Sequence, residues 1–237
     1  MATSGKTLRA DGVETRARLK TEAQKLFAVR GFEGVSIQDI VSAAGQRNNA
    51  SLRYYFGTKA ELVRELVVDG AKTIDERRQA LLNELEGSGE LSVRSVMDTL
   101  SLPLLELRQS TGEATYIRMI ANLQLNNRAL LREALGDTWN VGYRRAIEHL
   151  RRLLNHIPGP LLEQRISLVS SIFGNAAWAA WEAAQESTGP SRFWSEPFAV
   201  ANVCDALQHA LEGPPSEQAL ELLNGAPCHA LSGEGTP

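Results

Sequence analysis

The sequence is poor in the residues on which disulfide-rich, metal-binding and membrane-spanning proteins depend. Its two cysteines, Cys204 and Cys228, make neither a disulfide framework nor a metal cluster. The histidines show no metal-ligand spacing with these cysteines or with one another. No run of about 18 uncharged apolar residues occurs, so we expect no contact with a membrane. The N-terminus lacks an apolar signal region, which favours the cytoplasm.

Signatures of catalysis are missing as well. There is no nucleophile motif, no glycine-rich phosphate loop and no plausible constellation of carboxylates, so we expect neither an enzyme nor a cofactor. Nothing in the later chain alternates with the period of a β-strand. With 237 residues, 43% hydrophobic and 22% charged, the chain is long enough for one large or two modest globular domains.

The net charge of −3 is unevenly distributed along the chain. Residues 1–59 hold ten Lys or Arg and five Asp or Glu, a net charge of +5, which leaves −8 on the remainder. A basic end on an otherwise acidic body indicates that the N-terminal part faces nucleic acid, because DNA phosphates would repel the body.

A short amphipathic helix is predicted from Ser36 onward. Ser36 and Asp39 form a helix-start signature, in which a hydroxyl accepts hydrogen bonds from exposed amides and an acid favours the positive helix end. Gly45 can supply the left-handed residue that ends the helix. The apolar residues of one face follow at i, i+3, i+4 and i+7: Ile37, Ile40, Val41 and Ala44.

A second short helix is predicted from about residue 49 to 55. Leu52 and Phe56 share one face by their i, i+4 spacing, which leaves polar side chains on the other faces. Arg and Asn can pair with purine edges in the major groove, whereas Ser, Tyr and Lys commonly bind phosphate oxygens. Thr58 and Glu61 then form a capping box that starts a further helix. This arrangement predicts a DNA-binding helix-turn-helix.

Residues 15–63 resemble the N-terminal domain of the TetR family of transcriptional regulators. The resemblance rests on the Leu26-Phe27 pair, the Arg30-Gly31-Phe32 helix end, Ser36 and Ile40 before Ala44-Gly45, and the Tyr55-Phe56-x-x-Lys59 ending. It implies that helices near 14–30, 36–44 and 49–55 form the DNA-binding domain, with the third in the major groove. It further implies that Tyr54, Thr58 and Lys59 match family positions that hold phosphates.

The turn between the two short helices departs from the commoner family pattern. The spacing from Gly45 to Leu52 is one residue longer, so residues 46–49 make a longer turn. Arg53 stands where many members have tyrosine, and an arginine there can add a groove or phosphate contact. The predicted DNA-binding residues are Ser36, Gln46, Arg47, Asn48, Asn49, Ser51, Arg53, Tyr54, Thr58 and Lys59.

The whole chain is predicted to be all-α, with a helix-turn-helix domain at residues 14–59 and a larger effector-binding and dimerisation domain at 60–212. Residues 60–85 form the connector helix between them. Residues 1–13 are expected to be a flexible tail, with a minor-groove arm as the alternative. The Pro- and Gly-rich residues 213–237 are expected to be a mobile tail, with at most a short helix near 216–223.

Two late segments predict a homodimer. Residues 166–184 form an almost uncharged helix rich in small residues, and together with the last helix near 197–211 they resemble the family's four-helix dimer interface. A twofold-related pair of recognition helices implies an approximately palindromic double-stranded operator. Burial inside a single chain is the alternative for both tryptophans. The predicted interface residues are Trp178, Trp181, Val203, Leu207 and Ala210.

The resemblance implies that a small-molecule effector enters a pocket among the central helices, and we expect this pocket near the helix that Pro103 kinks or divides. Core packing is the alternative for each wall residue. The few charges in the set favour a mostly apolar or aromatic effector, with Asn122, Gln124 and His149 as polar anchors. The predicted ligand-binding residues are Leu104, Tyr116, Met119, Ile120, Asn122, Leu123, Trp139, Tyr143 and Phe173.

Together these features predict a ligand-responsive, homodimeric DNA-binding regulator, a repressor that an effector releases from its operator. One alternative is a constitutive or activating DNA-binding factor without an effector. Another, of a different class, is a helical enzyme or small-molecule-binding protein with a vestigial helix-turn-helix.

Overall fold

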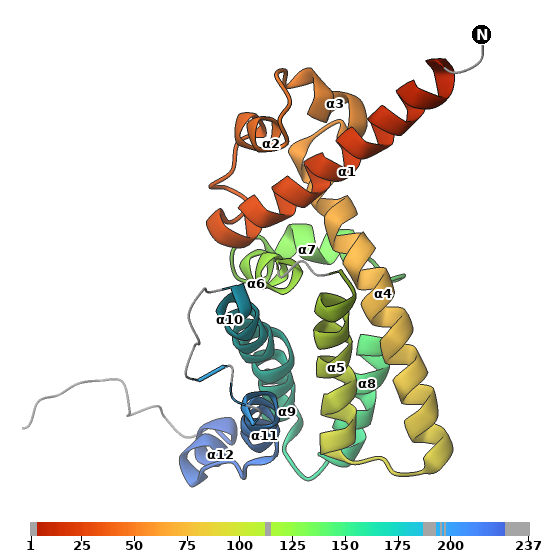
Figure 1. The fold of residues 1–237 in the computed structure, drawn as a ribbon. Coiled ribbons are helices and arrows are strands. Elements are labelled where there is room, and N and C mark those ends of the chain that lie inside the picture. Colours follow the sequence, from red (N-terminus) through yellow and green to blue (C-terminus); the bar gives the residue numbers. More distant parts are fainter. Residues whose placement is uncertain (1–3, 112–114, 187–192, 195, 197, 226–237) are drawn as a thin grey trace, which may run out of the picture.

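The computed structural model describes residues 4–111, 115–186, 193, 194, 196 and 198–225, and over these residues it contains helices and no strand (Figure 1). The all-α prediction is confirmed. The helices in chain order are α1 (Ser4–Arg30), α2 (Ile37–Ala43), α3 (Ala50–Phe56), α4 (Lys59–Ser88), α5 (Val93–Thr111), α6 (Tyr116–Asn126), α7 (Arg128–Leu135), α8 (Val141–Leu153), α9 (Gly159–Ile166), the π-helical segment η1 (Ser167–Phe173), α10 (Gly174–Glu186), α11 (Ala199–Glu212) and α12 (Glu217–Leu223).

The first three helices and the start of α4 form a small domain at one end of the molecule (Figure 1). Its core contains Phe27 of α1, Ile40 of α2 and Leu52 of α3, all fully or almost fully buried. The predicted capping boxes are both present: Ser36 with Asp39 begins α2, and Thr58 with Glu61 begins α4. Gly45 has the left-handed backbone expected after α2, with φ +69°.

The N-terminal tail prediction requires correction. Helix α1 begins at Ser4, so residues 4–13, expected to be a flexible tail, are helical. Gly12 lies beside α3, and a Cβ built on it would lie 3.5 Å from the Tyr55 hydroxyl oxygen. Packing of this turn against α3 stabilises helix where the composition alone indicated a tail.

Helix α4 connects the small domain to the larger body, along which it runs for most of its length (Figure 1). It ends at Ser88, three residues beyond the predicted connector, and Gly89 supplies a left-handed cap with φ +72°. Helices α6 and α7 lie across the top of the body, directly below α1 (Figure 1). One continuous apolar cluster joins Leu19 and Phe27 of α1 to Met119 and Leu123 of α6. The two domains therefore share a core.

Pro103 neither divides α5 nor leaves a carbonyl unsatisfied. The helix is continuous from Val93 to Thr111. A proline has no N–H to bond the carbonyl four residues earlier, which here is that of Thr99. The buried guanidinium of Arg78 on α4 donates instead, from Nε to Thr99 O at 3.2 Å and from Nη2 to Leu100 O at 3.3 Å. A side chain from the neighbouring helix thus replaces the backbone bond that proline removes.

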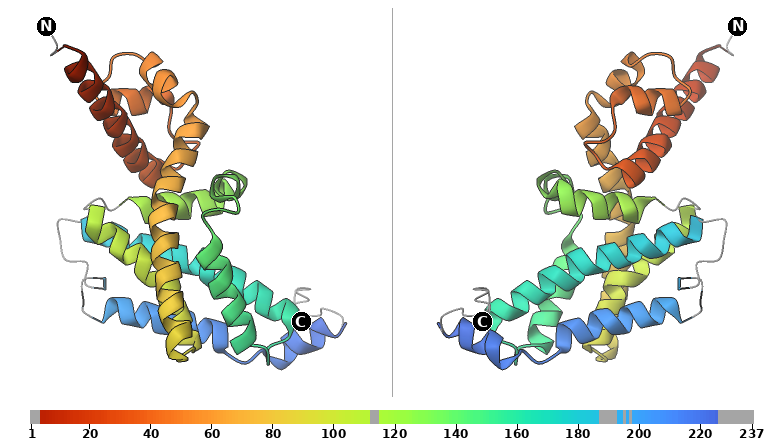
Figure 2. Two further views of the ribbon diagram at one scale, coloured as in Figure 1. Left: turned by 90° about the vertical axis from the view of Figure 1, so that its right-hand side faces the viewer. Right: turned by 90° about the vertical axis from the view of Figure 1, so that its left-hand side faces the viewer.

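Helices α9, η1 and α10 follow one another without a break, and α11 lies beside them on the face of the body turned away from α4 (Figure 2). Trp178 is 2% exposed and Trp181 is also buried, and their rings contact each other edge to face with centroids 6.5 Å apart. Both belong to the core of the body. After α11, the tail expected over residues 213–237 contains α12, near the short helix foreseen there; residues 226–237 lie outside the described residues.

The C-terminal end of α4 is tied to α8 by a charged cluster. Glu86 accepts hydrogen bonds from Arg145 Nε at 2.8 Å and pairs with His149 Nε2 at 2.7 Å. The bonds from Arg145 and then His149 lower the pKa of Glu86 from 4.5 to about 2. His149, expected to be a polar anchor of the pocket, serves this link instead.

We expect Glu86→Gln to lower the free energy of unfolding at pH 7 by about 1 kcal/mol or less, because the partly exposed pair is screened by solvent. A lowered carboxyl pKa stabilises the fold above the unfolded value of 4.5, and this stabilisation is lost as the pH falls towards about 2. The difference between wild type and variant in urea unfolding should therefore shrink between these pH values. A difference that grows over this range would contradict the assignment.

Candidate nucleic-acid interface and effector cavity

Helix α3 presents its polar side to solvent at the end of the molecule opposite the body (Figure 1). Leu52 and Phe56 anchor it in the core of the small domain, as their spacing predicted. Tyr54 is 82% exposed, with its ring against that of Tyr55 at a centroid distance of 4.9 Å. Arg53 beside it is exposed as well. A large aromatic side chain held in solvent next to a cation matches the chemistry of phosphate and base contacts.

The longer turn before α3 is closed by its own side chains. Asn48 Oδ1 accepts from the Ala50 amide at 2.9 Å, and the Ser51 hydroxyl donates to the Asn48 carbonyl at 2.6 Å. These two predicted DNA-binding residues therefore shape the turn. Gln46 is half-buried. Within the described part of the chain, four of the predicted residues keep exposed side chains with no hydrogen bond or ion pair: Arg47, Asn49, Arg53 and Tyr54.

The hydroxyls of Ser36 and Thr58 are engaged in the helix caps. Each accepts from an amide three residues on, at 3.1 Å in both cases, and each donates to the carboxylate of Asp39 or Glu61. Each hydroxyl therefore positions a helix N-terminus, and a contact of Ser36 or Thr58 with DNA stays a prediction. The 30-residue helix α4 begins after the exposed Thr58, and the uncapped amides and positive dipole end of a helix N-terminus favour an anion.

Lys59 has a structural role that the sequence did not reveal. Its ammonium donates to the carbonyls of Phe32 and Val35, both at 2.9 Å, and lies 4.0 Å from the centroid of the Phe32 ring. These bonds close the segment between α1 and α2 against α4. An ammonium has three hydrogens, so one remains for a phosphate.

Helix α6 is bonded directly to the small domain. Asn122 donates from Nδ2 to the Ala28 carbonyl at 2.9 Å, so this predicted ligand-binding residue contacts α1 instead of the cavity. Gln24 of α1 donates to the Thr115 hydroxyl, 2.8 Å away. Arg64 of α4 pairs with Glu133 of α7, 3.1 Å away. A displacement of α6 or α7 would therefore reach the small domain through these bonds.

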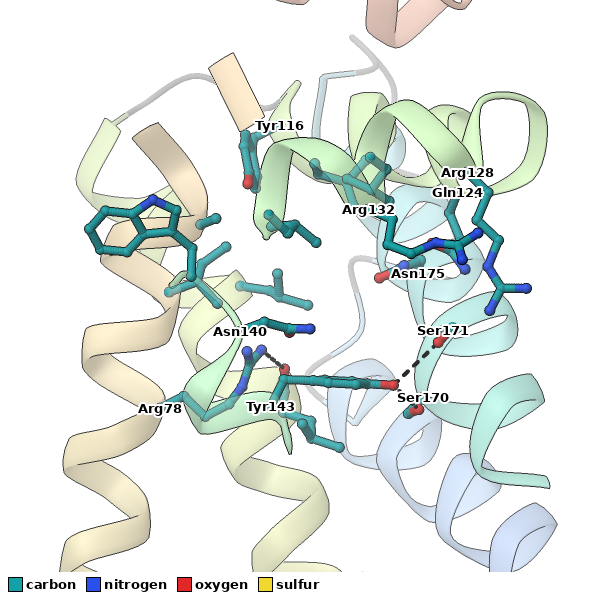
Figure 3. A pocket seen from close by; sticks show the side chains of 18 residues that line it. Arg78, Tyr116, Gln124, Arg128, Arg132, Asn140, Tyr143, Ser170, Ser171 and Asn175 are labelled. Atoms are coloured by element: carbon teal, nitrogen blue, oxygen red, sulfur yellow. Dashed lines mark hydrogen bonds between the residues drawn. The ribbon is translucent and has the colours of Figure 1, made fainter. Parts of the chain in front are cut away.

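A cavity of about 280 Å³ lies between α4, α5, α6, α7, α8, η1 and α10 (Figure 3). This volume lies just below the usual range for ligand pockets, about 300–1,000 Å³. Tyr116 closes one side of it: its hydroxyl donates to the Val67 carbonyl at 2.9 Å and its ring packs on Gly70. A Cβ at position 70 would lie 2.3 Å from ring carbons, so glycine permits this close approach.

The sequence located this cavity in part. Five of the predicted ligand-binding residues line it: Leu104, Tyr116, Ile120, Trp139 and Tyr143. Gln124, a predicted polar anchor, lines it as well. Met119 and Leu123 are buried in the core shared with α1, because α6 turns that face towards the small domain. Phe173 is 49% exposed and points away from the interior.

The polar part of the lining was largely missed. Tyr143 forms a hydrogen bond with Ser170 at 2.8 Å across the cavity (Figure 3). Asn140 and Asn175 also line it, together with three arginines: Arg78, Arg128 and Arg132. Burial lowers the pKa of Arg78 to about 10, which leaves it charged at neutral pH. The arginines of α7 were recognisable, since residues 128, 131, 132 and 135 share one helical face.

The predicted interface residues divide between the interior and the surface. Trp178, Trp181 and Leu207 are buried within the single chain, which favours the core alternative for both tryptophans. Val203 packs partly against the same core, and Ala210 is exposed. The sequence indicated an apolar helix correctly, but not which of its faces the chain itself covers.

In the part of the chain that the structure describes, no three His, Cys, Asp or Glu side chains are grouped to hold a metal ion. Nor does any helix there combine the length and hydropathy needed to cross a membrane.

Comparisons with known proteins agree with the geometry of the small domain. Residues 21–66 match the family model described as bacterial regulatory proteins, tetR family. Over 77 residues the chain is 34% identical to the uncharacterized HTH-type transcriptional regulator YdgC of Bacillus subtilis (strain 168). The matched stretch is 32% of this chain and 39% of that relative.

A solved structure, that of the TetR family transcriptional regulator PfmR from Thermus thermophilus, aligns with 84% of this chain and all of its own length. The TM-score is 0.43 and the sequence identity 19%. The assignment rests on the two sequence matches and on the capped, glycine-terminated helix pair that they cover. The N-terminal helix-turn-helix domain of this chain thus matches that of the TetR family of bacterial regulatory proteins, over residues 21–66.

Proposed function

We propose that the protein is a cytoplasmic, non-enzymatic repressor that binds double-stranded operator DNA as a homodimer and is released by a small-molecule effector. The observation that carries the proposal is the set of exposed, unbonded groups of α3 and its preceding turn, which includes Arg47, Asn49, Arg53 and Tyr54. Arginine and asparagine are the residues that most often read purine edges, and tyrosine commonly binds phosphate. They lie in the most basic part of the sequence.

The arrangement of α6 supports effector control. Tyr116 and Ile120 of this helix line the cavity, while Asn122, two residues beyond Ile120, bonds to α1. A ligand that moves α6 therefore has a direct mechanical route to the small domain. Coupling of this kind corresponds to about 1–3 kcal/mol and acts equally from ligand to DNA and from DNA to ligand.

The exposed face of η1, α10 and α11 supports the homodimer. Phe173, Ala176 and Ala180 recur at i, i+3 and i+7, so they share one helical face, and each is exposed. Ala206 and Ala210 of α11 are exposed too. Small side chains allow two helices to approach closely, and Phe173 offers an aromatic anchor. This face replaces the tryptophans in the proposed interface.

DNA selected in vitro by the purified protein, at a stated salt concentration, tests the proposal. We expect an approximately palindromic site whose half-sites are about 34–36 Å apart, or separated by a further helical repeat. The affinity should fall steeply with salt, because phosphate contacts release counterions. Weak binding without sequence preference would contradict the proposal.

A further inference from the structure

The face of α7 that lines the cavity is both apolar and cationic. Residues 128, 131, 132 and 135 follow one another at i, i+3, i+4 and i+7 and all four line the cavity. Leu131 is buried and Leu135 is half-buried. Arginines with only a solubilising role belong on the opposite side of such a helix. Arg128 and Arg132 instead share the side of the leucines, although both arginines are exposed to solvent.

These two arginines have no anionic partner among the residues that the structure describes. The nearest carboxylates in the sequence are bound to other arginines, since Glu133 pairs with Arg64 at 3.1 Å and Asp137 with Arg144 at 2.7 Å. No aspartate or glutamate is among the described residues that line the cavity. Two adjacent cations next to an apolar volume are therefore left without a counter-charge.

The rest of the lining complements an anion with an apolar body. Figure 3 shows Arg128 and Arg132 on one side of the cavity, with the amides of Gln124 and Asn175 close to them. Away from this group the wall includes apolar side chains such as Ile74 and Leu104, and also the polar Asn140, Tyr143, Ser170 and Ser171. Arg78 also lines the cavity; its hydrogen bonds go to neutral carbonyls, and the buried carboxylate of Asp75 offsets part of its charge.

We infer that the effector is an amphipathic anion, whose single carboxylate or phosphate group binds Arg128 and Arg132 while its apolar body fills the cavity. The inference deepens the proposed function and rests on it. It changes the sequence-based expectation of a mostly apolar or aromatic effector, which counted few charges because it omitted α7. Guanidinium groups bind both kinds of headgroup with charge-assisted, often bidentate hydrogen bonds.

The same headgroup position explains how binding is communicated. Arg132 is adjacent to Glu133, whose bond to Arg64 links α7 to the first turns of α4, next to the small domain. An anion that draws Arg132 towards the cavity would also shift Glu133 and thereby its ion pair with Arg64. The contact is local, and it needs no long pathway through the body.

The test uses the full-length protein and probes that differ only in the headgroup. Octanoate, octyl phosphate, octan-1-ol and octylamine form one series; 3-phenylpropanoate, 3-phenylpropan-1-ol and 3-phenylpropylamine form the other. Titration calorimetry measures each dissociation constant. In at least one series we expect an anion to bind about ten-fold or more tightly than the alcohol and the amine, as charge-assisted bonds exceed neutral ones. The tighter of octanoate and octyl phosphate identifies the headgroup.

The variant Arg128→Gln/Arg132→Gln should abolish the preference for the anion and leave binding of the alcohol unchanged. Arg132→Glu should reverse it in favour of octylamine. Arg152→Gln is the matched control, because Arg152 is an exposed arginine of the body that does not line this cavity. Thermal unfolding of each variant verifies that the fold is intact.

Equal or tighter binding of the alcohol or amine, no binding of any anion, or a preference that survives the double substitution would overturn the inference. Operator binding is measured separately with the selected duplex. If octanoate binds selectively but the operator is not released, the anion site stands and the ligand-responsive part of the proposed function fails.

Discussion

Arg53→Ala is expected to weaken operator binding by about 2–6 kcal/mol, since each of two half-sites would lose an arginine contact of about 1–3 kcal/mol. Arg53 is exposed on α3 and makes no bond within the described chain that its removal would break. The thermal midpoint should therefore not change. Fluorescence anisotropy with the selected duplex, at one fixed salt concentration, measures the affinities of the wild type and of Arg53→Ala.

Arg152→Ala is the control for this experiment, because it removes an equal charge from α8, a helix of the body that lies far from α3 (Figure 1). An equal loss of affinity in both variants would mean that net charge governs binding and that Arg53 makes no specific contact. The salt dependence separates the two kinds of contact. Loss of a phosphate contact lowers the slope of log affinity against log salt by about one per site, whereas loss of a base contact relaxes sequence preference.

Glu182→Ala is expected to lower the free energy of unfolding by about 3–5 kcal/mol, the usual result of removing one partner of a buried charged network. Glu182 of α10 is 1% exposed and caps the first turn of α6. Its carboxylate accepts from the amides of Ile117 at 3.3 Å and Arg118 at 2.9 Å, and lies 3.7 Å from Arg118 Nε. The neighbouring Thr115 makes no side-chain cap, and its hydroxyl accepts from Gln24.

Thermal unfolding at one protein concentration measures this effect, and the midpoint should fall by roughly 6–20 °C. Glu182→Gln should lower the midpoint less, because an amide oxygen still accepts from the α6 amides although the negative charge at the helix end is gone. Glu217→Ala, in the exposed first turn of α12, is the control and should change the midpoint little. Equal midpoints for Glu182→Ala and this control would show that the cap does not stabilise α6.

The helix-turn-helix was predictable because its determinants are local. Ser36 forms a capping box with Asp39, and Thr58 forms one with Glu61, each three residues further on. Gly45 adopts a left-handed backbone directly after α2. The apolar face of α2 and the Leu52–Phe56 pair follow from the 3.6-residue period. The extent of α1 was misjudged, because the contact of Gly12 with Tyr55 joins segments that are distant in sequence.

By itself, the sequence determined the all-α class, the small basic domain, its turn and the approximate position of the cavity. Only the tertiary structure decided that Arg78 replaces the bond lost at Pro103, that Glu182 caps α6, that Lys59 closes a turn and that both tryptophans are internal. The physical reason is the range of the interactions. Caps and periodic faces act within a few residues, whereas the bonds of Arg78, Lys59 and Glu182 join partners 21, 27 and 65 residues away, whose proximity exists only in the folded chain.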